Sequence, residues 1–88
     1  MKLSPLARAA ALDLAARLDI TFQQAIGGLV LLADLDTQIT TTVLRFHLSA
    51  AFGVTELAVI DEVVDRLLLA GIIDENEDQP GWWEVTLP

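Results

Sequence analysis

Gly71 marks the point at which the sequence changes from helical to alternating spacing. Before it, apolar residues recur at helical intervals from Leu57 to Ala70, which predicts an amphipathic helix of about 56–70. Glycine at this place is typical of the left-handed residue that ends a helix. Beyond it, "IID" and "WWEVTL" flank the polar turn "DENEDQPG", which predicts a hairpin of about 72–87. The fold class should therefore be mainly α with a small β-hairpin.

Capping signals predict where the helices begin. Ser4 followed by Pro5 supplies a capping side chain and then a residue preset for the first helical turn. Thr21 and Gln24 fit the capping-box pattern, and Thr55 is expected to cap the last helix. The connector "DTQIT" precedes the third helix and is expected to carry a single β-bridge. The expected helices span about 5–18, 22–35, 41–52 and 56–70.

The second expected helix, "FQQAIGGLVLLADL", is apolar nearly all round after its first turn, so it should be buried on several sides. Each of its two adjacent glycines costs a helix about 1 kcal/mol relative to alanine, which suggests that another backbone comes close there. Packing within the fold and a dimer interface both remain open. The interface would comprise Ile26, Gly27, Gly28, Leu29 and Val30.

The size and hydropathy of the chain suggest exposed apolar surface. The 88 residues support one domain, 1–88, and a chain this short buries only about 60–65% of the surface that its unfolded form exposes. Yet 53% of its residues are hydrophobic and its mean hydropathy is +0.52. We therefore expect an exposed apolar patch or an oligomer interface.

Several features exclude broad classes of protein. Cysteine is absent, which excludes disulfides, thiolate metal sites and a thiol nucleophile. The start, "MKLSPLARAA", has no signal-peptide core, and no apolar run approaches the roughly 20 residues of a membrane span. We expect a soluble cytoplasmic protein with no membrane partner.

The net charge of −8 is concentrated in the last third of the chain. Residues 1–54 hold four acids and four bases, whereas residues 55–88 hold nine acids and one base, Arg66. Such a field repels phosphate and favours basic partners. Many soluble proteins are simply acidic, so the charge alone does not assign a function.

The stretch "LSAAFGVTELAVIDEVVDRLLLAGIID" resembles the helix-turn-helix of winged-helix proteins. Leu48 and Ala51 precede the turn at Gly53 and Val54, and "GWWEV" is similar to the second wing strand. The upstream "LAARLDITFQQAIGGLVLL" resembles the leading helices of winged-helix domains in phage replication-organiser and regulator proteins. The resemblance covers about residues 12–87. It implies a winged helix-turn-helix with an extra N-terminal helix, and winged helices serve DNA binding and protein binding alike.

The fourth helix carries acids where a DNA-binding winged helix would carry arginine, lysine or amide side chains. At 100° per residue, one broad arc is apolar and should face the core: Leu57, Val59, Ile60, Val63, Val64, Leu67, Leu68 and Ala70. The helix start and the opposite arc carry Glu56, Asp61, Glu62, Asp65 and Leu69. Glu62 is also spaced to pair with Arg66, the only base nearby.

The expected wing is also negatively charged. It holds Asp74, Glu75, Glu77 and Asp78, whereas DNA-binding wings commonly hold bases that contact phosphate. On electrostatic grounds, we therefore do not expect DNA to bind through this helix and wing. The spacing of the acids resembles the start of a calcium loop, but Gln79 stands at the glycine position and Val85 at the final glutamate position. We expect a solvated acidic turn and no metal.

Alternation along "GWWEVTL" puts Trp83, Val85 and Leu87 on one face of the strand and Trp82 and Glu84 on the other. The resemblance assigns Trp83 to the core. Trp82 is then either an exposed interaction hot spot beside the acidic wing or a ring lying flat against its neighbours.

The sequence offers few side chains that are suited to catalysis. His47 is the only histidine, and Ser49, two residues away, points elsewhere on a helix. With no cysteine, tyrosine, second histidine or phosphate-binding glycine loop, we expect no enzyme, no cofactor and a structural role for His47.

The sequence therefore predicts an acidic winged-helix protein-interaction module. Its acids and Trp82 or Leu69 would dock on a protein with a basic, nucleic-acid-binding surface, as in a phage-type inhibitor of the anti-CRISPR or DNA-mimic kind. Reversal of Asp61, Glu62 and Asp65 to lysine would then abolish binding and leave the fold intact.

Two alternatives stay open. One is a homodimeric DNA-binding regulator or phage replication accessory protein, in which the expected phosphate contacts are Lys2, Arg8, Arg17 and Arg45. The other is a structural or assembly subunit with an obligate interface.

Overall fold

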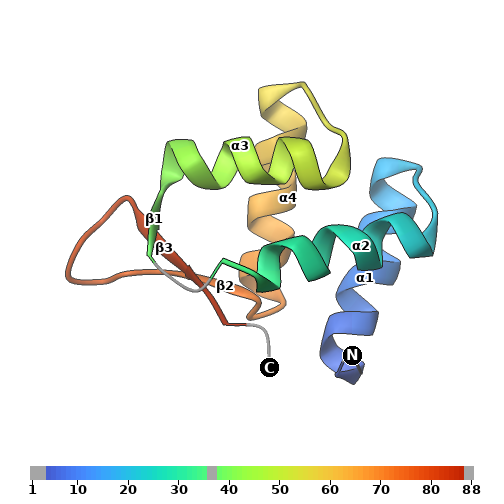
Figure 1. The fold of residues 1–88 in the computed structure, drawn as a ribbon, viewed down its shortest axis with the longest axis horizontal. Coiled ribbons are helices and arrows are strands. Elements are labelled where there is room, and N and C mark those ends of the chain that lie inside the picture. Colours follow the sequence, from blue (N-terminus) through green and yellow to red (C-terminus); the bar gives the residue numbers. More distant parts are fainter. Residues whose placement is uncertain (1–3, 36–37, 87–88) are drawn as a thin grey trace.

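A computed structural model describes residues 4–35 and 38–86, and in that part of the chain four helices join a three-stranded sheet (Figure 1). The helices and strands are α1 (Pro5–Leu18), α2 (Phe22–Ala33), β1 (Ile39–Thr40), α3 (Thr41–Phe52), α4 (Leu57–Leu69), β2 (Ile73–Glu75) and β3 (Trp82–Val85). The predicted class, mainly α with a small β-hairpin, is confirmed. Lys2, Asp36 and Leu87 lie outside the described residues.

The predicted capping signals hold for the first two helices. Ser4 Oγ accepts a 3.2 Å hydrogen bond from the Ala7 amide, and Thr21 and Gln24 form a reciprocal capping box. The predicted cap of α4 was wrong, because Glu56 occupies that position and makes no side-chain capping bond. The signal at Thr55 was misleading because the turn from α3 is one residue longer than expected.

The helix ends differ slightly from the prediction. Helix α2 stops at Ala33 rather than residue 35, since Asp34 already lies in a turn. Gly71 has a φ of +75°, and the Ile72 amide reaches back to the Leu67 carbonyl at 3.0 Å. This left-handed closure of α4 confirms the predicted role of Gly71.

The sheet has the order β1–β3–β2, with both pairs antiparallel. Ile39 lies opposite Trp83, and Ile73 lies opposite Val85. The connector expected to carry a single bridge therefore supplies a two-residue edge strand. Figure 1 shows the sheet and its hairpin loop at one end of the long axis and α1 at the other.

Helices α3 and α4 are bent by 96° at the break between them. This lies within the range of about 90–120° that is typical of helix-turn-helix pairs. Gly53 ends α3 with a φ of +68°, and Ser49 Oγ donates a hydrogen bond to the Val54 carbonyl, which fixes the turn.

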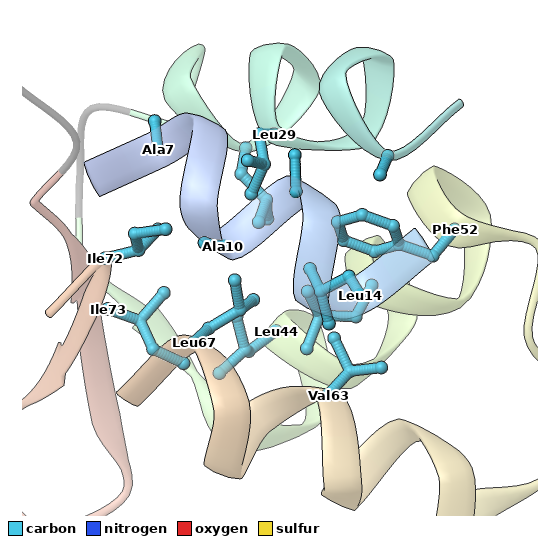
Figure 2. Packing of buried hydrophobic residues seen from close by; sticks show 14 of the residues in the cluster. Ala7, Ala10, Leu14, Leu29, Leu44, Phe52, Val63, Leu67, Ile72 and Ile73 are labelled. Carbon is cyan, nitrogen blue, oxygen red and sulfur yellow. The ribbon is translucent and has the colours of Figure 1, made fainter. Parts of the chain in front are cut away.

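The core lies where the helices meet the inner face of the sheet (Figure 2). Its largest fully buried side chains are Leu14, Leu29, Leu32, Leu44, Leu48, Leu67, Ile72, Ile73 and Val63. Trp83 joins them at 8% exposure, and its indole Nε1 donates a 2.8 Å hydrogen bond to Thr41 Oγ1. That bond ties β3 to the first turn of α3.

The core-facing arc predicted for α4 is too broad. Only Ile60, Val63 and Leu67 are buried, whereas Leu57 is 57% exposed and Leu68 is also exposed. The first turn of α4 extends past the packed region, since Glu56, Leu57 and the next residue are all exposed. Much of the apolar surplus therefore remains on the surface.

The two adjacent glycines in α2 are not explained by the close backbone approach that the sequence suggested. A Cβ on Gly28 would lie 2.7 Å from Cδ1 and 2.8 Å from Cζ of Phe52, so an aromatic ring, rather than a backbone, packs there. A Cβ on Gly27 would meet nothing within 4 Å. Packing within the fold therefore explains Gly28 alone.

Among the described residues, no single helix is long and apolar enough to cross a bilayer; α3 and α4 reach that criterion only when taken together across their bend.

Candidate acidic interaction surface

The acidic face of α4 is partly neutralised by a neighbouring helix. Arg45 of α3 contacts the Asp61 carboxylate through Nε at 3.0 Å and through Nη2 at 3.4 Å. Both side chains are partly exposed, so the pair adds little stability, typically about 0.2–1 kcal/mol. It does neutralise one carboxylate of the α4 face, for which the sequence predicted a role in partner binding.

Glu62 is neutralised by α1 and not by its own helix. Arg17 Nη1 lies 3.1 Å from Glu62 Oε1, and Arg17 Nε lies 3.2 Å from Asp13. The predicted pairing of Glu62 with Arg66 was wrong, because Arg66 instead lies 4.0 Å from Asp13. Helical spacing permitted that pair, but the packing of α1 against α4 supplies a nearer guanidinium.

Two of the acids predicted for the α4 face are not compensated by a nearby cation in the described chain. Glu56 and Asp65 are exposed and have no ion-pair partner among residues 4–35 and 38–86. The α4 face therefore presents two uncompensated carboxylates in place of the four that its sequence suggests.

The hairpin, in contrast, is uniformly acidic. From Ile73 to Val85 the chain holds five acids and no base, and every one of these acids is exposed: Asp74, Glu75, Glu77, Asp78 and Glu84. No cation of the described chain forms an ion pair with any of them. The anionic surface that remains free for a partner thus lies mainly on the hairpin.

The hairpin loop is held by its own polar groups. Glu75 Oε2 accepts a 2.9 Å hydrogen bond from the Gly81 amide, and Asn76 Oδ1 accepts one of 2.9 Å from the Asp78 amide. These bonds fix the loop shape, so its carboxylates are presented from a defined backbone. Within the described residues, no group of three or more acidic or histidine side chains is arranged to hold a metal ion.

The outer face of the sheet combines this charge with an aromatic ring. Asp74 lies directly opposite Glu84, and Thr40 lies opposite Trp82. Residues opposite one another in an antiparallel pair share a face, so Asp74, Trp82 and Glu84 form one exposed surface. Trp82 is 41% exposed and Trp83 is buried, which confirms the predicted alternation.

Glu84 was missed as a site residue. Alternation along β3 already placed it on the face of Trp82, so the signal was present in the sequence. Its position opposite Asp74 depends on the strand register, which the sequence pattern did not define. Together with the two loop acids, these residues form what we call the hairpin face: Asp74, Glu77, Asp78, Trp82 and Glu84. Glu75 lies opposite the buried Trp83 and so belongs to the other side of the sheet.

Leu69 is 80% exposed but belongs to another surface. It lines a shallow groove between α1 and α4 together with Leu6, Leu14 and Arg66. The structure therefore does not join Leu69 with Trp82 in one group.

The strip predicted as a dimer interface on α2 is not a surface strip. Gly28 and Leu29 are buried inside the domain, Ile26 and Val30 are half-buried, and only Gly27 is exposed. The face of α2 that carries Gly28 and Leu29 is covered by α1 and α3 instead.

Two of the three arginines expected to contact phosphate are engaged in ion pairs with acids of α4. Arg17 and Arg45 form the ion pairs described above, while Arg8 is exposed. His47 is half-buried and its ring lies edge-on to Phe46, with centroids 6.0 Å apart.

Comparisons of the chain with protein-family models, with curated proteins and with solved structures found no match.

Proposed function

We propose that this protein is an interaction module of the winged-helix type, whose hairpin face docks on a basic, nucleic-acid-binding surface of another protein. The observation that carries the proposal is the run of five exposed carboxylates on the hairpin without a compensating cation in the described chain. A surface of this kind attracts basic partners and repels phosphate.

The winged-helix part of the proposal is supported by element order. Helices α3 and α4 are bent by 96°, and α4 leads through Gly71 into a hairpin that pairs with an edge strand ahead of α3. In this arrangement α4 takes the place of the recognition helix and the β2–β3 loop takes the place of the wing.

Docking would begin with long-range steering and finish with close contacts on the sheet. Uncompensated carboxylates raise the association rate with a cationic surface, and this effect falls as salt screens the charges. The Trp82 ring, beside Asp74 and Glu84, then offers a cation–π platform for an arginine or lysine of the partner. Aromatic side chains of this kind often carry a large share of interface energy.

A small winged helix with reversed charge suits an inhibitor that occupies a nucleic-acid-binding groove, in the manner of DNA-mimic or anti-CRISPR proteins. The DNA-binding alternative has less support, because two of the arginines that it requires are engaged with Asp61 and Glu62.

The test is capture of heparin-binding proteins from a host lysate on the immobilised chain, with and without excess duplex DNA. We expect the wild type to retain a basic protein that duplex DNA displaces. The variant Asp74→Lys/Glu77→Lys/Asp78→Lys should lose this capture while its circular dichroism and thermal unfolding remain close to those of the wild type.

A matched variant, Asp34→Lys/Glu56→Lys/Asp65→Lys, changes the net charge equally at exposed acids that form no ion pair in the described chain, and it leaves the hairpin face intact, so it should retain most of the binding. Equal loss in both variants would indicate that net charge alone governs capture, and the assignment to the hairpin face would then be abandoned. Capture that duplex DNA does not displace would overturn the nucleic-acid-binding partner.

A further inference from the structure

Helices α2 and α3 form a part of the surface that carries almost no formal charge. The two helices have 12 residues each, and none of the 13 acids of the chain lies within either of them. Their one formal charge is that of Arg45, which is directed to Asp61 on α4. They lie side by side in Figure 1, and each is packed against the other.

An apolar knob stands on this face. Phe46 is 71% exposed, and Val43 and Ala50, one helical turn away on either side, are exposed as well. The ring of Phe46 lies edge-on to the ring of its neighbour His47. Exposure of a full phenyl ring on a rigid helix is unfavourable unless something covers it.

An apolar hollow lies beside the knob. A groove of about 350 Å³ between α2 and α3 is lined by Leu31, Leu32, Asp34, Leu35, His47, Ala50 and Ala51. A second hollow continues from Leu31 and Ala51 past Gly27 and Gly28. Leu31 itself is exposed, and Asp34 is the one acid that lines the groove among residues 4–35 and 38–86.

We infer that this face binds a second copy of the same chain, with Phe46 of each protomer inserted into the α2–α3 groove of the other. A two-fold dimer requires a surface that is complementary to itself, and a knob and a hollow side by side on one face meet that requirement. Charge limits where two copies can meet, because a chain of net charge −8 repels its own copies wherever acids face each other. On the α2–α3 face, two copies can meet with few of the described carboxylates in contact.

The area required is modest. Stable interfaces bury about 800 Å² from each partner, against a total accessible surface of 5413 Å² for this chain. The open space above Gly27 allows close approach of the partner's helix there, since no atom lies within 4 Å of where its Cβ would be. This interface is separate from the hairpin face and does not depend on the proposed function.

The experiment is sedimentation of the full chain over a concentration series from low micromolar to submillimolar, compared with two variants. We expect a reversible wild-type dimer, and dissociation constants raised about 30-fold or more by Phe46→Gln, which removes the knob, and by Ala50→Gln, which obstructs the groove. Leu12→Gln, which removes an apolar side chain that is 60% exposed from α1, should leave the dimer unchanged.

Mixing the two variants tests directly whether Phe46 of one protomer inserts into the groove of the other. A mixture of the two variants restores one intact contact per dimer, since the knob of Ala50→Gln meets the open groove of Phe46→Gln, so it should associate more tightly than either variant alone. Added salt should strengthen this association, because it screens repulsion between two acidic chains, whereas it should weaken docking of a basic partner. A wild type that stays monomeric throughout the series, or a dimer unaffected by both variants, would overturn the inference.

Discussion

Arg45 of α3 contacts Asp61 of α4 through two nitrogen atoms, at 3.0 and 3.4 Å, and so joins the two helices of the candidate helix-turn-helix by charge. One member of this pair was expected to contact phosphate and the other to contact a basic partner. Because they bind each other, neither is free for the role that the sequence suggested. The ion pairs of α4 therefore shift the candidate site from the helix to the hairpin.

The Arg45–Asp61 pair should contribute measurable but small stability. A double-mutant cycle with Arg45→Gln and Asp61→Asn should give a coupling free energy of about 0.2–1 kcal/mol, since both side chains are partly exposed. Urea unfolding at low and high salt measures it, and the coupling should shrink with salt. The same cycle between Arg45→Gln and Asp65→Asn should give no coupling, and a coupling of equal size there would contradict the assigned contact.

The adjacent glycines of α2 should respond to alanine with opposite signs. Gly27→Ala should stabilise the protein by about 1 kcal/mol, because the site is open and alanine is the better helix former. Gly28→Ala should destabilise it by about 1–3 kcal/mol, because the new methyl group collides with the buried Phe52 ring. Thermal or urea unfolding of the two variants provides an internally matched comparison. Equal effects at both positions would contradict the packing of Phe52 on Gly28.

Removal of the hydroxyl that binds Trp83 should destabilise the junction between α3 and the sheet. Thr41→Val leaves the indole N–H without its 2.8 Å partner, at a cost of about 1–3 kcal/mol. Near-ultraviolet circular dichroism should report the altered surroundings of the tryptophan. The neighbouring Thr42 is exposed, so Thr42→Val serves as the control and should change the free energy of unfolding by only a few tenths of a kcal/mol.

The facing carboxylates on the sheet should cost stability. Glu84→Gln removes like-charge repulsion with Asp74, and we expect an increase in the free energy of unfolding of about 0.2–1 kcal/mol at low salt. Added salt should reduce the gain. Glu77→Gln, in the hairpin loop, has no residue directly opposite it and should change stability less. A gain in stability that accompanies weaker capture of basic proteins would agree with a surface kept for binding.

Duplex DNA should not bind at low salt. Titration of labelled random duplex with micromolar protein should show no saturable change in anisotropy, because the hairpin face is anionic and most arginines of the described chain are paired. Arg8→Gln would be the next variant if binding were seen. Saturable binding that weakens steeply with salt would favour the DNA-binding regulator over the interaction module.

Local patterns predicted most of the secondary structure. The caps at Ser4 and Thr21, the left-handed Gly71 and the alternation that buries Trp83 each depend on neighbours in the chain, and each is present. Such features follow from hydrogen bonds and backbone conformations that span a few residues, so they can be read without knowledge of the fold.

The candidate site required contacts between distant residues. The sequence alone determined that this chain is acidic, mainly helical and closed by a hairpin with one outward tryptophan. Only the tertiary structure decided which carboxylates stay uncompensated, because Arg17 and Arg45 reach Glu62 and Asp61 across helix–helix contacts 45 and 16 residues apart in the chain. The packing of helices also decided which apolar residues stay on the surface, since a helical arc shows which side chains lie together but not how much of that arc its neighbours cover.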